Sequence, residues 1–200
     1  MNTPIYDFLQ KYADSNIMRL HMPGHKGKIF CDPLATIYPY DITEIKGADS
    51  LFEANGIIKE SEENASKLFN TIQTVYSTQG STLCIQTMLA LAAKPRSTVI
   101  AARNAHKAFL NTCVLLDLDV SWIYPKSADC EETIVSYNYT VEDIEKAILA
   151  AENPSCVYIT SPDYYGRMAD ISAISVLCRK YNIPLLVDNA HGAHLAFLEE

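Results

Sequence analysis

Positive charge is scarce in this chain. The 16 lysine and arginine residues are outnumbered by 24 acidic residues, for a formal net charge of -8, and the basic residues form no cluster. Because nucleic-acid phosphates are held mainly by basic patches, we expect no nucleic-acid partner. Backbone amides can still bind a small anion on an acidic chain of this kind.

Long apolar runs and paired cysteines are also missing. No run approaches the length of a membrane span, and no basic segment followed by an apolar stretch opens the chain, so we expect no membrane partner and no signal peptide. The 6 cysteines form no Cys-x-x-Cys pair, and several lie within apolar runs, where cysteine acts as a small hydrophobe. These absences predict a soluble, cytoplasmic protein with reduced cysteines.

Apolar residues are plentiful enough for a sizeable core, at 48% of 200 residues. Residues 1–60 hold one clear helix signal, Thr3 before Pro4, and are expected to form an N-terminal arm. From residue 61 onward, helical and strand-like segments alternate. The expected helices cover residues 62–69, 81–93, 106–116, about 140–152 and 171–181, and the expected strands cover residues 74–78, 98–102, 119–124, 155–160 and 184–188.

This alternation is typical of an α/β fold with a mostly parallel sheet and helices on both faces. Residues 61–200 are therefore expected to form one α/β domain. Ligands of such folds bind at the carboxyl ends of the strands. Several polar segments of this chain directly follow the expected strands, so the predicted site lies at that edge.

Asp188 is the strongest candidate at this edge. It follows the apolar run Leu185-Leu186-Val187, and His191 comes three residues later. A buried carboxylate without a partner costs about 2 to 5 kcal/mol, so Asp188 is expected to face a cation, such as the protonated ring nitrogen of pyridoxal phosphate (PLP). The alternative is that Asp188 caps a helix that begins near residue 190.

The segment Gly80-Ser81-Thr82 is a candidate phosphate cradle, since it lies between an expected strand and an expected helix. Unpaired amides, the helix dipole and two hydroxyls favour a phosphate there. A Ser or Thr at a helix start more often serves only as a cap. The glycine spacing and the missing Lys-Ser/Thr ending exclude a nucleotide P-loop.

Two further segments follow expected strands. His106 comes after the strand at 98–102, where its imidazole can stack on a planar cofactor or cap a helix. Lys107 beside it is expected to be solvated or to face a phosphate rather than to form a Schiff base. In residues 161–166, Pro162 and Gly166 predict a tight turn, whether or not this loop also binds a ligand.

Histidine pairs at His21 and His25, and at His191 and His194, raise the question of a metal site. Proline and glycine separate the first pair, so the two rings do not share one helical face, and no His-Glu-x-x-His motif is present. We expect no metal site.

Six motifs, in order, resemble the N-terminal part of the bacterial Orn/Lys/Arg decarboxylases, which are fold-type I PLP enzymes of the aspartate aminotransferase superfamily. They are His21-Met22-Pro23-Gly24-His25-Lys26, Asp41-Ile42-Thr43-Glu44-Ile45, Gly80-Ser81-Thr82, Arg103-Asn104-Ala105-His106-Lys107, Ser161-Pro162-Asp163-Tyr164-Tyr165-Gly166 and Val187-Asp188-Asn189-Ala190-His191-Gly192-Ala193-His194. Each motif is modest alone, but six in the right order are jointly specific, and they span the chain from His21 to His194. The resemblance implies the large domain of a PLP-dependent transferase, here incomplete.

The resemblance also implies how PLP would be held. Ser81 and Thr82, with the amides around Gly80, would bind the phosphate, and His106 would stack on the pyridine ring.

Three residues near the last strand would serve the ring and the reaction. Asp188 would pair with the ring nitrogen, and Ala190 would pack under the ring. His191 would lie beside the reacting centre, toward the ring hydroxyl or the substrate carboxylate. The implied reaction is decarboxylation of arginine, lysine or ornithine.

The chain departs from the family pattern at some positions. The Schiff-base lysine of the family would come shortly beyond Glu200, and no lysine follows Lys180, so the chain alone is expected to be inactive. Asp163 stands where Thr is commoner, and its charge is expected to weaken cofactor binding. Since related enzymes share their site across a dimer, a homodimer or association with a complementary chain is expected. The alternative is a non-catalytic remnant that binds PLP or serves as an interaction module.

Overall fold

The computed structural model describes residues 2–28, 33–124 and 139–198. Contacts divide the chain into two compact units, Met1–Tyr76 and Ser77–Glu200. This division falls later than the residue 60 expected from the sequence, because helix α2 (Ile57–Leu68) packs against helix α1 (Pro4–Ala13). Within the described ranges, no helix combines the length and the apolar character needed to cross a bilayer.

The first unit contains α1, a short 3-10 helix η1 (Tyr38–Tyr40) and α2. Helix α1 has Pro4 at its first position, as the sequence predicts. The loop before α2 is organised by Asp49, whose carboxylate accepts the backbone N–H groups of Ser50, Asn55, Gly56, Ile58 and Lys59. These hydrogen bonds, first among them the one from Asn55, hold the pKa of Asp49 well below its usual range.

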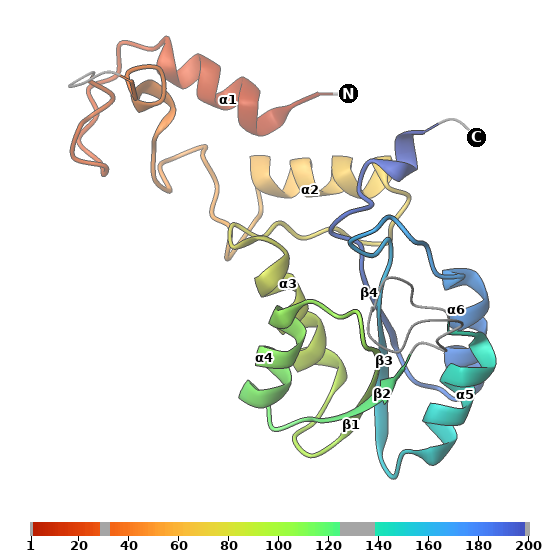
Figure 1. Ribbon diagram of the computed structural model, residues 1–200. Coiled ribbons are helices and arrows are strands. Elements are labelled where there is room, and N and C mark those ends of the chain that lie inside the picture. The colour runs from red at the N-terminus through yellow and green to blue at the C-terminus, as the bar shows by residue number, and fades with distance from the viewer. Residues whose placement is uncertain (1, 29–32, 125–138, 199–200) are drawn as a thin grey trace. The chain divides into compact units, whose positions relative to one another are not determined.

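The second unit is built on a sheet of four parallel strands (Figure 1). The strands are β1 (Thr98–Ala102), β2 (Asp119–Ile123), β3 (Pro154–Thr160) and β4 (Leu185–Asp188), and their spatial order is β2-β1-β3-β4. The register pairs Thr160 with Asp188 and Ala102 with Ile123, so the last residues of adjacent strands lie next to one another.

Helices cover both faces of this sheet (Figure 1). Helices α3 (Gly80–Ala92) and α4 (Lys107–Leu115) lie on one face, and α5 (Val141–Ala150) and α6 (Ile171–Lys180) lie on the other. Because strand side chains alternate, Val99 and Tyr158 enter the core beneath α3 and α4, whereas Ile100 and Ile159 enter the core beneath α5 and α6. The predicted α/β fold with a parallel sheet between two helical layers is confirmed.

One expected strand is wrong, since residues 74–78 form no strand. The amide of Tyr76 donates to Glu62 Oε1 at 2.9 Å, and its hydroxyl donates to the Ser61 carbonyl at 3.0 Å. The backbone donor that a neighbouring strand would use is therefore occupied by a side chain of α2. As a consequence, Gly80 follows an irregular segment rather than a strand.

Candidate functional site

The carboxyl edge of the sheet carries all the residues predicted for the site. The loops after β1, β3 and β4 leave from this edge because the strands are parallel, and α3 begins there because it runs back toward the start of β1 (Figure 1). The predicted residues at this edge are Gly80, Ser81, Thr82, His106, Asp188, Ala190 and His191.

Asp188 is the last residue of β4 and is buried, with 6% of its surface exposed. Its Oδ2 accepts a hydrogen bond from the hydroxyl of Tyr158 at 3.0 Å, and its Oδ1 accepts one from the amide of Ala190 at 3.2 Å. Both donors are neutral, and no described cationic side chain forms a hydrogen bond or ion pair with Asp188. The alternative interpretation, a helix cap, is not what the structure shows, because no helix begins at Ala190.

Tyr158 is a site residue that the sequence reasoning missed. It lies in the middle of β3, is fully buried and packs its ring against Phe109 with centroids 4.4 Å apart. Burial and, after it, the negative charge of Asp188 raise the pKa of Tyr158, so the phenol keeps its proton and remains a donor. A tyrosine within an apolar strand signals that a hydroxyl needs a buried partner, but only the register of β3 on β4 identifies Asp188 as that partner.

The start of α3 offers unpaired backbone donors. Gly80, Ser81 and Thr82 are its first three residues, all are exposed, and no side chain caps the helix. The interpretation of Ser81 or Thr82 as a simple cap is therefore not supported. Gly80 has φ of 64°, a left-handed conformation that glycine adopts without strain. The first turn thus presents amides and two hydroxyls to an anion.

His106 is the N-cap of α4. Its Nδ1 accepts the amide of Ala108 at 3.1 Å, and the residue is exposed. Capping does not exclude stacking, because the hydrogen bond uses one ring nitrogen, whereas stacking uses a face of the ring. Lys107, the first residue of α4, is exposed, which agrees with the expectation of a solvated lysine.

The loops after β3 and β4 are joined to each other. The amide of Ser161 donates to the Asp188 carbonyl at 3.0 Å, which extends the strand pairing beyond β4. Gly192 is buried against Pro162, and a Cβ at this glycine would overlap the proline ring. His191 is exposed in this turn, and its ring meets that of Tyr164 at 86° with centroids 6.0 Å apart.

Asp163 is buried, and its carboxylate accepts hydrogen bonds from the backbone of its own turn. It is 4% exposed, and its Oδ1 accepts the amides of Tyr165 at 2.9 Å and Arg167 at 3.0 Å. Its own amide donates to the Arg167 carbonyl at 2.9 Å. The carboxylate therefore shapes the turn that it belongs to.

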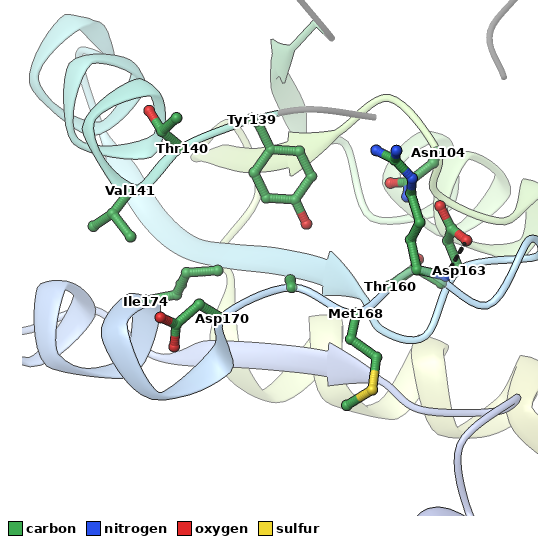
Figure 2. A pocket seen from close by; sticks show the side chains of 11 residues that line it. Asn104, Tyr139, Thr140, Val141, Thr160, Asp163, Met168, Asp170 and Ile174 are labelled. Atoms are coloured by element: carbon green, nitrogen blue, oxygen red, sulfur yellow. Dashed lines mark hydrogen bonds between the residues drawn. The ribbon is translucent and has the colours of Figure 1, made fainter. Parts of the chain in front are cut away.

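A cavity of about 490 Å³ opens beside this turn, at the ends of β1 and β3 and next to the starts of α5 and α6 (Figure 2). Its polar lining includes Asn104, Tyr139, Thr160, Asp163 and Asp170. Burial and the charge of Asp163 raise the pKa of Tyr139 to about 12. None of the seven predicted site residues lines this cavity, so it is a neighbour of the predicted site and not the site itself.

The histidine pairs belong to no group of three or more potential metal ligands among the described residues. His21 uses Nε2 with the Tyr12 hydroxyl, at 2.6 Å, and Nδ1 with the Met22 carbonyl. His25 uses Nε2 with Asp41, at 3.1 Å, and Nδ1 with the Gly27 amide, at 3.0 Å.

The sequence matches a known family over almost its full length. The family model described as "Orn/Lys/Arg decarboxylase, major domain" covers residues 3–200. The chain is 32% identical over 200 residues to the uncharacterized protein YaaO of Bacillus subtilis (strain 168), and the match covers 97% of this chain and 41% of that protein. It is 31% identical over 203 residues to an arginine decarboxylase of Halalkalibacterium halodurans, and that match covers 98% of this chain and 41% of the relative. The chain thus spans about two fifths of the length of these relatives.

Solved structures show the same fold. The constitutive lysine decarboxylase of E. coli matches 98% of this chain and 29% of its own, with a TM-score of 0.74 and 20% sequence identity. The lysine decarboxylase LdcF of Francisella novicida also matches 98% of this chain and 29% of its own, with a TM-score of 0.75 and 22% identity.

Proposed function

The chain belongs to the Orn/Lys/Arg decarboxylase family, and on this premise we propose that it is the cofactor-binding part of a PLP-dependent decarboxylase of basic amino acids. The observation that carries the proposal is Asp188: a buried carboxylate at a strand end whose two hydrogen-bond donors are both neutral. A buried carboxylate without a cationic partner is costly, and a cationic ring nitrogen would offset that cost.

The residues present fit the cofactor at both of its ends. At the phosphate end, the uncapped first turn of α3 supplies the amides of a helix N-terminus together with the hydroxyls of Ser81 and Thr82. At the ring end, Asp188 would accept the pyridine N–H, and Tyr158 would keep the carboxylate in place through its hydrogen bond to Oδ2. When bound, PLP supplies an electron sink for the bond that breaks at the substrate α-carbon.

The remaining predicted site residues would orient and enclose the cofactor ring. His106 would cover one face of the ring from the end of β1, with its ring plane held by the bond to the Ala108 amide. Ala190, whose amide is held by Asp188, would pack under the other face. His191 would stand beside the reacting carbon, where an imidazole can hold or move a proton.

The substrate class is supported by the relatives. Proteins named arginine decarboxylase in Halalkalibacterium halodurans and Bacillus subtilis are 31% and 30% identical to the chain. Arginine, lysine and ornithine share a cationic side chain, so the proposed substrate is a basic amino acid. The same proposal makes PLP the cofactor and the cytoplasm the compartment. The described cysteines are all free thiols and would stay reduced there.

Equilibrium dialysis of the chain against PLP tests the proposal. Replacing Asp188 by Asn removes the charge and keeps the shape. Because a hydrogen bond to a charged group contributes about 1.5–3 kcal/mol, we expect Asp188→Asn to weaken PLP binding by about 10- to 150-fold. The matched control is Asp119→Asn, an exposed carboxylate at the start of β2 and therefore at the opposite edge of the sheet.

A chimera tests the reaction itself. Residues 1–200 would replace the matching segment of the Bacillus subtilis arginine decarboxylase; the match covers 99% of this chain and 41% of that protein. We expect PLP-dependent release of carbon dioxide from a basic amino acid, and its loss in Asp188→Asn. A folded chain whose PLP affinity is the same with Asp or Asn at position 188 would refute the assignment.

A further inference from the structure

The loop after β3 carries two solvent-exposed tyrosines. Tyr164 is 83% exposed and Tyr165 is 64% exposed, and their rings meet at 89° with centroids 5.6 Å apart. On its other side the Tyr164 ring meets His191, at a centroid distance of 6.0 Å. Tyr164, Tyr165 and His191 therefore form an aromatic group at the carboxyl edge, and His191 is the member of this group assigned to the reacting centre.

The backbone beneath these rings is held firmly. The buried Asp163 carboxylate accepts the Tyr165 amide at 2.9 Å, and the Gly166 amide donates to the Asp163 carbonyl at 3.0 Å. Ser161 anchors both ends of the loop: its amide donates to β4 at Asp188, and its hydroxyl oxygen accepts the Ala169 amide at 3.0 Å. A loop tied down in this way does not collapse to bury its aromatic rings, so their exposure is built into the fold.

Exposed aromatic faces attract cations. The quadrupole of a tyrosine ring binds ammonium and guanidinium groups, and the attraction grows when the cation is drawn out of water. The chain also carries a net charge of -8, which favours a cationic ligand over an anionic one.

We propose that Tyr164, flanked by Tyr165 and His191, is the platform for the side-chain cation of the basic amino acid substrate. This inference rests on the proposed function for the identity of the substrate. It assigns Tyr164 a specificity role: the ring selects a charged side-chain end over a neutral one of the same shape, and it takes no part in bond breaking.

The test compares arginine with citrulline, in which a neutral urea replaces the guanidinium group at nearly the same size. Calorimetry measures the dissociation constant of each compound for the chain, with and without PLP. In Tyr164→Leu, which removes the ring, we expect arginine to bind about 3- to 30-fold more weakly and citrulline to change less than twofold. Tyr164→Phe keeps the ring and should bind arginine like the unaltered chain.

Controls separate this effect from a general loss of structure. Tyr6→Leu removes a tyrosine that is 61% exposed on α1 in the other unit, and it should change neither constant. PLP affinity and the fluorescence of Trp122, the single tryptophan of the chain, should be the same in Tyr164→Leu as in the unaltered chain.

The outcomes distinguish this inference from the proposed function. If PLP binds with the expected dependence on Asp188 but Tyr164→Leu leaves the preference for arginine over citrulline intact, the platform is refuted and the cofactor site stands. If PLP fails to bind while the PLP-free chain shows a preference that disappears in Tyr164→Leu, the cofactor proposal falls and the cation platform stands. Equal weakening of arginine and citrulline, or no arginine binding in either form, overturns the platform.

Discussion

The hydrogen bond between Tyr158 and Asp188 can be tested by removing one hydroxyl. Tyr158→Phe keeps the ring that packs 4.4 Å from Phe109 and deletes only the donor that reaches Asp188 Oδ2 at 3.0 Å. The acceptor, the Asp188 carboxylate, is charged and buried, so the lost hydrogen bond contributes about 1.5–3 kcal/mol to the folded state. We expect the free energy of unfolding of the second unit to fall by that amount.

Trp122 provides the assay. This tryptophan lies on β2 in the second unit, with its ring 5.8 Å from that of Phe109, so its fluorescence during urea unfolding reports on the sheet. Because burial and the charge of Asp188 raise the pKa of Tyr158, the hydroxyl stays protonated. The loss in Tyr158→Phe is therefore expected to be the same at pH 6 and at pH about 9.

A double-mutant cycle isolates the bond from other effects of the substitution. In an Asp188→Asn background the acceptor is neutral, so Tyr158→Phe should cost about 0.5–1.5 kcal/mol there, less than in the unaltered chain. A loss below about 0.5 kcal/mol in the unaltered chain, or an equal loss in both backgrounds, would show that the hydroxyl does not stabilise the carboxylate.

Two further predictions concern a glycine and a loop carboxylate. Gly192→Ala places a methyl group against the Pro162 ring, so we expect the free energy of unfolding, measured by urea unfolding, to fall by about 1–3 kcal/mol. Gly24→Ala serves as the control, because a Cβ at Gly24 meets nothing within 4 Å. The backbone hydrogen bonds that lower the pKa of Asp49 stabilise the first unit fully above pH about 4, and this contribution is lost as the pH falls toward the lowered pKa. The urea concentration at the midpoint of unfolding, followed by the NMR resonance of the Gly56 amide, should therefore decrease between pH 6 and about 3 in the unaltered chain and change less in Asp49→Asn. Equal decreases in the two proteins would contradict this role of Asp49.

Much of the second unit could be predicted because its signals are local. The β-branched run before Ala102 predicts strand β1 with the bounds that the structure has, Thr98–Ala102. Thr140 predicts the start of α5, and the structure shows it in a capping box with Asp143. Periodicity and caps lie in consecutive residues, so they can be recognised without knowledge of the fold.

The failures involve partners that are distant in sequence. Residues 74–78 have the composition of a strand, but the Tyr76 amide binds Glu62, 14 positions earlier, so no strand forms. Nothing in the sequence indicated that the buried Asp188 carboxylate accepts a hydrogen bond from Tyr158, 30 positions earlier. Position in the sequence did not indicate either long-range pairing.

The sequence by itself determined the alternation of helices and strands, the start of α3 next to Gly80 and the position of Asp188 at a strand end, because each depends on neighbouring residues. Only the tertiary structure decided that Tyr158 donates to Asp188, that Asp163 accepts backbone amides of its own loop and that Tyr164 is exposed beside His191. These contacts depend on strand register and on the packing of two loops, and burial makes an unmatched polar group costly enough to select one arrangement.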